Sequence, residues 1–214
     1  LMDLDGTLVD SAADIALSLN RALADLGLGA VTEAQVCDWV GRGAARLIEV
    51  ALQHVVPHHG QDPQKHAVEA RLLAAFMARY QDSVCEASTA YLGVAEFVAA
   101  ARNAGIRLAC VTNKPYRPAV ALLEALNLLD AFELVIGGDT LAHKKPHPEP
   151  LLHCLRHFEV TAAQALMVGD SRNDVDAAKA AGVKSLALPY GYNHGEPIED
   201  CAPDRLVASL AELI

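Results

Sequence analysis

The chain has 214 residues, of which 52% are hydrophobic and 21% are charged, and its formal net charge is -10 at pH 7. This length is sufficient for one hydrophobic core with a small appended domain. The acidic balance argues against nucleic acid and anionic membranes as partners, because both require a basic face, so an anionic ligand must be held by local cations.

The sequence has no clear targeting signal and no cysteine pattern typical of disulfides or metal sites. No stretch approaches the roughly 18 uncharged apolar residues of a membrane span, and we find no secretory signal pattern. The five cysteines are widely spaced and form no Cys-x-x-Cys pair, which favours reduced thiols buried as small hydrophobic groups. We therefore expect a cytoplasmic protein that is either a monomer or a homodimer.

The first eleven residues place two carboxylates one residue apart at the end of a short apolar strand. Alternation along a strand sends Asp3 and Asp5 to the same side, where they repel and would raise each other's pKa unless a cation lies between them. A hard divalent cation such as Mg2+ would relieve this repulsion, which indicates metal-assisted phosphoryl chemistry. The alternative is an Asp-Gly turn with both acids solvated. A buried strand usually has about 5 or 6 residues, so we expect part of this one to precede Leu1.

Residues 11 to 86 have the pattern of helices only. Apolar residues recur at helical spacing from Ile15 to Leu26, a capping box at Thr32–Gln35 begins a second helix, and residues 44–56 form a third. Asp62 and Pro63 supply the N-cap and the first-turn proline of a long fourth helix.

From residue 87 onward, helices alternate with short apolar strands. We predict helices over 94–104, 115–126, 149–158 and 174–181, and strands over 107–111, 133–136, 165–168 and 185–188. A closing helix is predicted over 206–214, and a short strand could precede it. Repeated helix-strand units indicate an α/β fold with a doubly wound, Rossmann-like parallel sheet.

This change of pattern divides the chain into two predicted domains. Residues 1–13 and 87–214 form an α/β core, and residues 14–86 form an all-helical cap inserted after the first strand. No comparably long insertion occurs between residues 136 and 165, so we predict a single cap.

Polar side chains follow several of the predicted strands, where parallel sheets bind ligands. Asp3 and Asp5 follow the first strand, Thr112 and Asn113 the second, and Lys145 lies in the connection after the third. In phosphoryl transfer, Asp3 would attack phosphorus to form an aspartyl-phosphate, and Asp5 would act as acid and then base. Thr112 and Asn113 would bind the phosphoryl group, and Lys145 would neutralise its charge.

Two further acids follow the fourth strand. Asp170 would complete a Mg2+ site together with the Asp3 carboxylate and the Asp5 backbone carbonyl. Asp174 would lie behind this site and orient Lys145 or the waters of the metal. The alternative for Asp174 is an ordinary first-turn helix acid.

Four motifs of the sequence resemble, in order, those of the haloacid dehalogenase superfamily in its phosphatase form. They are Asp3–Ser11, Val111–Lys114, Lys145–Leu151 and Gly169–Asp174. The resemblance spans the chain and implies an enzyme that hydrolyses phosphate monoesters with Mg2+ through an aspartyl-phosphate.

Within the superfamily, four stretches, two of which extend the motifs above, are similar to the bacterial phosphoglycolate phosphatases. They are Val135–Asp139, Lys144–Leu151, Gly169–Gly182 and Tyr190–Gly195. This similarity implies 2-phosphoglycolate, a small phosphorylated metabolite, as the substrate. The alternatives are another small phosphate ester, a sugar-phosphate mutase of the same superfamily, and a phosphate-binding protein without turnover.

Three features have weaker signals. Arg42 and Arg46 lie at a break between cap helices, where a guanidinium could meet a substrate carboxylate, and the alternative is a pair of surface arginines. Tyr190–Gly195 is read most simply as a glycine-rich turn. His153 and His157 have a spacing that zinc sites use, but a solvated helix face accounts for them with fewer assumptions.

Overall fold

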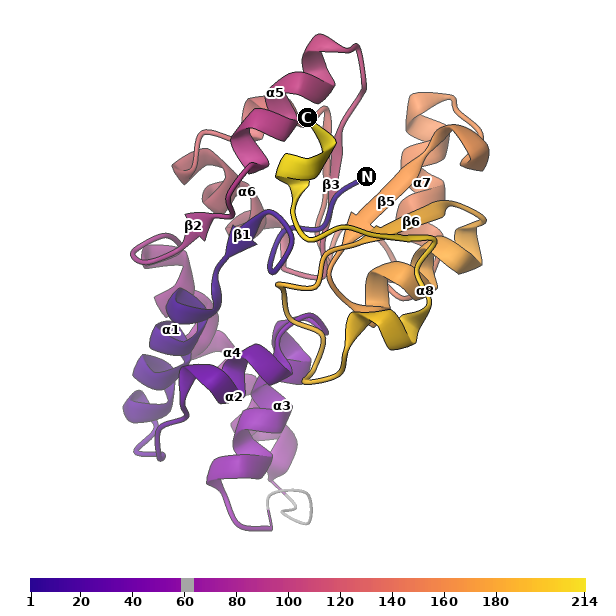
Figure 1. The fold of residues 1–214 in the computed structure, drawn as a ribbon. Coiled ribbons are helices and arrows are strands. Elements are labelled where there is room, and N and C mark those ends of the chain that lie inside the picture. The colour runs from indigo at the N-terminus through magenta and orange to yellow at the C-terminus, as the bar shows by residue number, and fades with distance from the viewer. Residues whose placement is uncertain (59–63) are drawn as a thin grey trace.

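A parallel sheet forms the centre of the protein, which we describe from a computed structural model covering residues 1–58 and 64–214 (Figure 1). β3 (Ala109–Val111) pairs with β4 (Leu134–Ile136), while β5 (Leu166–Gly169) pairs with β6 (Lys184–Ala187), which in turn pairs with β7 (Arg205–Leu206). Met2 joins the two halves, because it forms parallel bridges to both Cys110 and Val168. The spatial order is therefore β4, β3, the first residues, β5, β6 and β7, which confirms the predicted doubly wound sheet.

Helices cover both faces of this sheet. α5 (Val94–Asn103) and α6 (Tyr116–Ala125) pack on one face, and α7 (Glu149–Phe158) and α8 (Arg172–Ala181) pack on the other. The alternation along β3 is the cause, since Cys110 points toward the first pair of helices while Ala109 and Val111 point toward the second. All five cysteines are free.

The end of the chain differs from the prediction of a closing helix over 206–214. Leu206 belongs to β7 and pairs with Ala187 of β6, so the short strand that could precede the helix is present. Only a 3-10 turn, Leu210–Leu213, follows it, and Leu210 is fully buried. The sheet is the reason, because Leu206 is paired in β7 and Val207 N donates to Ala187 O at 3.2 Å, so the first residues of the predicted helix are extended.

Four helices form a second group beside the sheet (Figure 1). They are α1 (Ala12–Asp25), α2 (Glu33–Trp39), α3 (Ala44–Val55) and α4 (Lys65–Asp82). Their apolar faces pack into one cluster, to which Tyr192 also belongs. The predicted capping box is present, with Gln35 N donating to Thr32 Oγ1 at 3.2 Å. Asp62 and Pro63, the predicted start of the fourth helix, lie outside the described residues. None of the described helices could cross a lipid bilayer.

A two-residue antiparallel ladder, which the sequence did not predict, joins the chain segments that run between the sheet and the helical group. β1 (Val9–Asp10) pairs with β2 (Thr89–Ala90). Next to it, the buried Asp14 carboxylate of α1 accepts hydrogen bonds from the backbone N–H of Ala87 and Ser88. Both chain crossings are thereby held together close to the predicted domain boundaries.

Candidate active site

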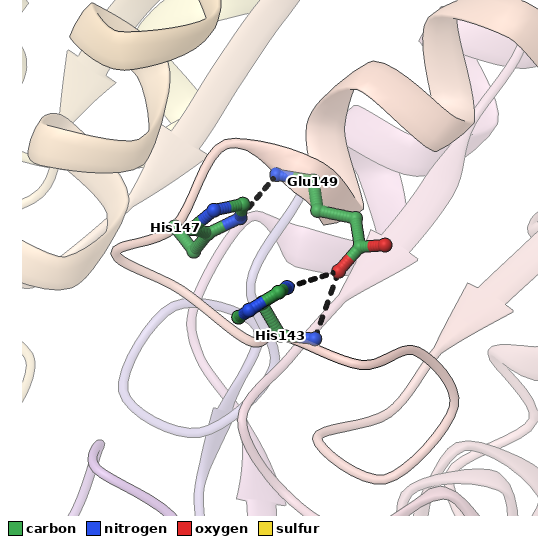
Figure 2. Close-up of side chains that lie close together, drawn as sticks. All are labelled: His143, His147 and Glu149. Atoms are coloured by element: carbon green, nitrogen blue, oxygen red, sulfur yellow. Dashed lines mark hydrogen bonds and ion pairs between the residues drawn. The ribbon is translucent and has the colours of Figure 1, made fainter.

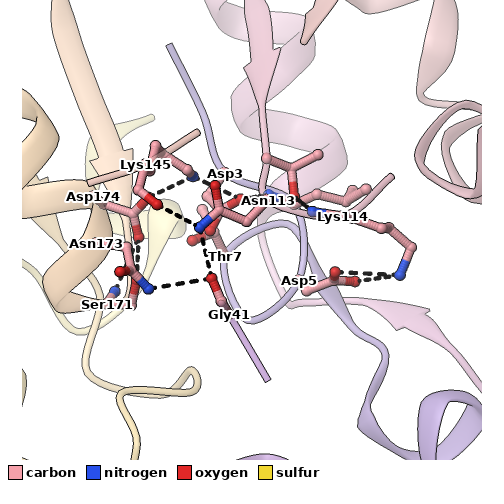
Figure 3. Close-up of polar contacts among 12 residues, drawn as sticks. Asp3, Asp5, Thr7, Gly41, Asn113, Lys114, Lys145, Ser171, Asn173 and Asp174 are labelled. Carbon is pink, nitrogen blue, oxygen red and sulfur yellow. Dashed lines mark hydrogen bonds and ion pairs between the residues drawn. The ribbon is translucent and has the colours of Figure 1, made fainter. Parts of the chain in front are cut away.

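Asp3 lies at the carboxyl end of the central strand, at the switch point of the sheet, and faces the lysine of the β4–α7 loop. Lys145 Nζ lies 2.9 Å from Asp3 Oδ1 and 2.6 Å from Asp174 Oδ1. Figure 3 shows the ammonium group between the two carboxylates. All three side chains are buried. The predicted proximity of Asp3 and Lys145 is therefore found.

Asp174 has a second task at the start of α8. Its Oδ2 accepts hydrogen bonds from the Ser171 backbone N–H at 3.1 Å and from Ser171 Oγ at 2.8 Å, which forms a reciprocal cap. One carboxylate thus fixes the helix start and the position of Lys145. The side chain is thus a first-turn helix acid, which the sequence analysis gave as the alternative, and it also contacts Lys145.

Asp3, Asp170 and Asp174 form a buried group of three carboxylates. One oxygen of each lies within 4.8 Å of the others. Burial raises the pKa of Asp3 to about 7, with Asp174 adding to the rise and Lys145 opposing it. Burial also raises the pKa of Asp170 well above its ordinary value, assisted by Asp3 and Asp174. One ammonium group cannot neutralise three carboxylates, so the group favours an additional cation.

The chemistry of these three side chains fits Mg2+. Their donors are all carboxylate oxygens, which are the ligands that hard divalent cations prefer. Asp170 is held firmly, since its Oδ1 accepts from Thr7 Oγ1 at 2.5 Å and its Oδ2 from Tyr192 N at 2.6 Å. Asp170 can lie this close to the backbone because residue 6 is a glycine: its φ is +86°, and a Cβ there would lie 2.2 Å from Asp170 Oδ2.

Asp5 has a different environment from Asp3. Its Oδ1 accepts from Lys114 Nζ at 2.9 Å (Figure 3). It also accepts from Ser11 Oγ at 2.6 Å. For Asp3, the neighbouring carboxylate that adds to the raised pKa is Asp174. The two acids still face one space, because both line the cavity between the sheet and the helical group.

Lys114 is the site residue that the sequence analysis missed. It is buried, and its Nζ also lies 2.5 Å from the hydroxyl of Tyr80 and 4.4 Å from the centre of the tyrosine ring. Burial lowers the pKa of Lys114, but Asp5 and Tyr80 outweigh burial and leave the pKa raised. The signal was its position in the Val111–Lys114 motif, two residues after Thr112.

Thr112 and Asn113 both line the cavity, as predicted, and both are buried. Thr112 Oγ1 accepts a hydrogen bond from Lys114 N at 3.2 Å. Asn113 Nδ2 donates to the carbonyl oxygens of Gly41 and Lys145, at 2.8 Å each. Its Oδ1 is buried without a partner among the described residues. The amide therefore joins the helical group to the loop that carries Lys145.

Neither predicted arginine lies in the cavity. Arg42 is exposed, and Arg46 forms an ion pair with Glu49 at 2.6 Å. The backbone is the reason: Gly41 O is held by Asn113, and Gly43 begins α3 with a φ of +86°, so this loop presents main chain to the core. The helical group instead lines the cavity mainly with apolar side chains, which are Ile15, Val40, Ala44, Leu47, Phe76 and Met77.

The Tyr190–Gly195 turn connects the acids to the start of α1. The Tyr192 hydroxyl donates to Asp10 and accepts from the backbone N–H of Ser11 at 3.0 Å, while Tyr192 N donates to Asp170. Asp10 does not cap α1, because Ser11 occupies the N-cap position. The sequence also did not predict a hydrogen bond from Asn173 Nδ2 to Gly41 O at 3.2 Å, which joins α8 to the helical group.

Comparisons with known proteins agree with this geometry. A family model described as haloacid dehalogenase-like hydrolase matches residues 1–188. The chain belongs to this family and is therefore an enzyme, a hydrolase, as the four motifs implied. A phosphoglycolate phosphatase of Nitrosococcus oceani is 43% identical over 213 residues, which cover 100% of this chain and 93% of that protein.

Solved structures give the same result. A crystal structure described as a predicted phosphoglycolate phosphatase from Haemophilus somnus 129PT has a TM-score of 0.90 at 34% identity, and the match covers 99% of this chain and 94% of that one. CbbY from Rhodobacter sphaeroides, solved in complex with xylulose-(1,5)bisphosphate, has a TM-score of 0.82 at 28% identity with the same coverage. The chain is thus similar to proteins named phosphoglycolate phosphatase and to a protein that binds a sugar bisphosphate.

Proposed function

We propose that this chain is a Mg2+-dependent phosphatase that hydrolyses 2-phosphoglycolate to glycolate and phosphate. The observation that carries the proposal is the buried Asp3, which contacts Lys145 and lies within 4.8 Å of two further carboxylates at the end of a cavity. A nucleophile, a cation for the phosphoryl oxygens and an oxygen-rich metal site are the parts that phosphoryl transfer requires.

In the proposed reaction, an Asp3 oxygen attacks phosphorus in line, and the bond from phosphorus to the leaving oxygen breaks. Asp5 donates a proton to that leaving oxygen and later takes one from the attacking water. The water oxygen then bonds to phosphorus, the bond to Asp3 breaks, and phosphate is released. Lys145, 2.9 Å from Asp3, and the Thr112 hydroxyl would stabilise the charge on the phosphoryl oxygens.

The Mg2+ ion would be held by the carboxylates of Asp3 and Asp170 and by the Asp5 backbone carbonyl. When bound, it would supply positive charge to the phosphoryl oxygens and offset the repulsion between the acids. Asp174 would position Lys145, which it contacts at 2.6 Å. Lys114 would position Asp5 through the ion pair at 2.9 Å.

We further propose that residues 14–86 form a cap domain over a core of residues 1–13 and 87–214. Support comes from the cavity, which has core residues on one side and residues of α1, α3 and α4 on the other. Its free volume is about 50 Å³, enough for only a few water molecules. A small leaving group suits this space, and the apolar cap surface would exclude bulk water during the reaction.

The substrate assignment rests on the relatives, since the Nitrosococcus oceani protein that bears the name phosphoglycolate phosphatase is 43% identical over the whole chain. A sugar bisphosphate is a second candidate, because CbbY in complex with xylulose-(1,5)bisphosphate has a closely similar structure. The two candidates differ in size and in the carboxylate that only 2-phosphoglycolate carries.

The decisive experiment measures phosphate release from a panel that contains 2-phosphoglycolate, xylulose-1,5-bisphosphate and an aryl phosphate, with Mg2+ and with a chelator. We expect the highest kcat/KM for 2-phosphoglycolate, and loss of activity in chelator and in Asp3→Asn. Asp130→Asn is the matched control, because Asp130 is an exposed aspartate. Faster hydrolysis of another ester would reject the substrate, isomerised product would favour a mutase, and no turnover of any compound would reject the activity.

A further inference from the structure

Two histidines and a glutamate converge on the surface at the loop between β4 and α7. His143 Nδ1 lies 2.9 Å from Glu149 Oε2, and His147 Nδ1 accepts a hydrogen bond from Glu149 N at 3.2 Å. Figure 2 shows the two imidazoles and the carboxylate facing one another. One ligand atom of each side chain lies within 4.8 Å of the others. No role in the proposed hydrolysis uses these side chains.

The local backbone explains why they meet. His147 N donates to Lys144 O at 2.9 Å, and this turn brings the rings of His143 and His147 into a stack with centroids 4.1 Å apart. Glu149 begins α7, and its carboxylate reaches back to the His143 N–H at 2.8 Å. Lys145 lies between the two histidines in sequence but points inward to Asp3. The same loop therefore has an inner face for the active site and an outer face with the three ligand groups.

The donor set suits a different class of metal from the buried acids. Two imidazole nitrogens and one carboxylate oxygen form a ligand set used by Zn2+, which binds each atom at about 2.0–2.2 Å and leaves a fourth position for water. Two ligands of one such ion are separated by roughly 3–3.5 Å, and His143 Nδ1 and Glu149 Oε2 are 2.9 Å apart. The ion would replace the proton that these two atoms share. The group of Asp3, Asp170 and Asp174 offers oxygen alone and favours a hard cation.

The ligands are also partly oriented before any ion arrives. Backbone N–H groups donate to both the Glu149 carboxylate and the His147 ring, at 2.8 and 3.2 Å. The side chains of His143 and Glu149 are 59% and 31% exposed, so an ion can reach them from solvent. Ligands held near their bound positions lose little freedom on binding.

We propose that His143, His147 and Glu149 form a binding site for a borderline transition-metal ion, of which Zn2+ is the type. The site is separate from the proposed Mg2+ site, and its occupation does not depend on the proposed hydrolysis. A bound ion would join residue 143 to residue 149 and so hold the loop that positions Lys145.

Calorimetric titration of the full chain with Zn2+, in the presence of saturating Mg2+, tests this site. We expect one equivalent of Zn2+ to bind, and His147→Gln or Glu149→Gln to weaken binding by at least about tenfold, the effect typical even of lost outer partners in metal sites. The matched control is His153→Gln with His157→Gln, which removes two histidines of α7 that do not belong to the group. This control should bind Zn2+ as the wild-type protein does.

A second measurement uses the wild-type protein and so does not depend on how the variants fold. Imidazole nitrogen NMR of the wild-type protein should show Zn2+-dependent shifts for His143 and His147, and none for His153 and His157. The proposal is overturned if Zn2+ does not bind, if saturating Mg2+ abolishes binding, if both sets of variants lose it equally, or if the shifts appear on the control histidines.

Discussion

Replacing Asp3 with asparagine should abolish phosphate release and, at the same time, stabilise the metal-free protein. The wild-type carboxylate is buried within 4.8 Å of two other acids and has one lysine, shared with Asp174, as its cation. An asparagine has nearly the same shape and no charge. The substitution therefore removes an unfavourable buried charge together with the proposed nucleophile, and sites built for function often carry such a cost.

The size of the effect follows from the pKa of Asp3, which burial raises from 3.8 to about 7. Because each pKa unit corresponds to about 1.36 kcal/mol, ionising Asp3 in the folded protein costs on the order of a few kcal/mol. The attraction of Lys145 is already contained in the shift. We expect the variant to gain up to about this amount.

The gain should depend on pH in a defined direction. Between about pH 4 and pH 7 the folded wild-type protein keeps a proton that the unfolded chain has released, so its stability falls as pH rises. The advantage of Asp3→Asn is therefore small below about pH 4, grows through this interval and is complete above about pH 7. A carboxylate with a lowered pKa would give the opposite trend.

Urea unfolding followed by circular dichroism, in a chelator and at several pH values, measures this difference. Asp130→Asn, a change at an exposed position, should leave the free energy of unfolding unchanged. Added Mg2+ should narrow the gap, because the ion offsets the repulsion only where the Asp3 charge is present. If Asp3→Asn unfolds more easily than wild type in chelator at alkaline pH, the electrostatic reasoning is wrong.

Three further predictions concern the same region. Mg2+ should raise the thermal midpoint more at about pH 8 than at about pH 5, because protons compete for the raised-pKa carboxylates, and calorimetry checks this. Lys114→Met should lower the free energy of unfolding by about 3 kcal/mol, because it leaves the Asp5 carboxylate without its buried cation. Tyr80→Phe removes only a hydrogen bond to Lys114 and should cost about 1 kcal/mol. Urea unfolding compares the two variants, and equal losses would contradict the ion pair. Gly43→Ala should cost about 1 kcal/mol because its φ is +86°, while Gly29→Ala, with nothing within 4 Å of the added methyl group, should not.

The positions of the acids could be predicted because strand order determines them. Asp3 and Asp170 each follow a strand, and parallel strands present their carboxyl ends at one edge of the sheet. The structure brings them together through the bridge from Met2 to Val168. The alternation of strands and helices along the chain was sufficient to predict that these two acids lie close together.

The pairing of Lys114 with Asp5 could not be predicted in the same way. The lysine follows a strand by several residues, and its direction depends on where α4 places Tyr80. Long charged side chains reach several ångströms from their backbone, so sequence position does not determine their partners. The position of Arg42 could not be predicted either, because it depends on the backbone. Asn113 binds the carbonyl oxygen of Gly41, and this contact determines the path of the loop that carries Arg42.

Charge balance links the composition of the chain to the proposed metal. An acidic protein must hold an anionic ligand with local cations, and here those cations are Lys145 and Lys114, both buried. Each is already paired with carboxylates, so the two lysines alone cannot balance both these acids and the charge of a phosphate. With Asp3, Asp5, Asp170 and Asp174 ionised, the two lysines leave two negative charges uncompensated. A divalent cation removes this excess, and a monovalent one does not, which is why the proposed hydrolysis requires Mg2+ before a phosphate can approach Asp3.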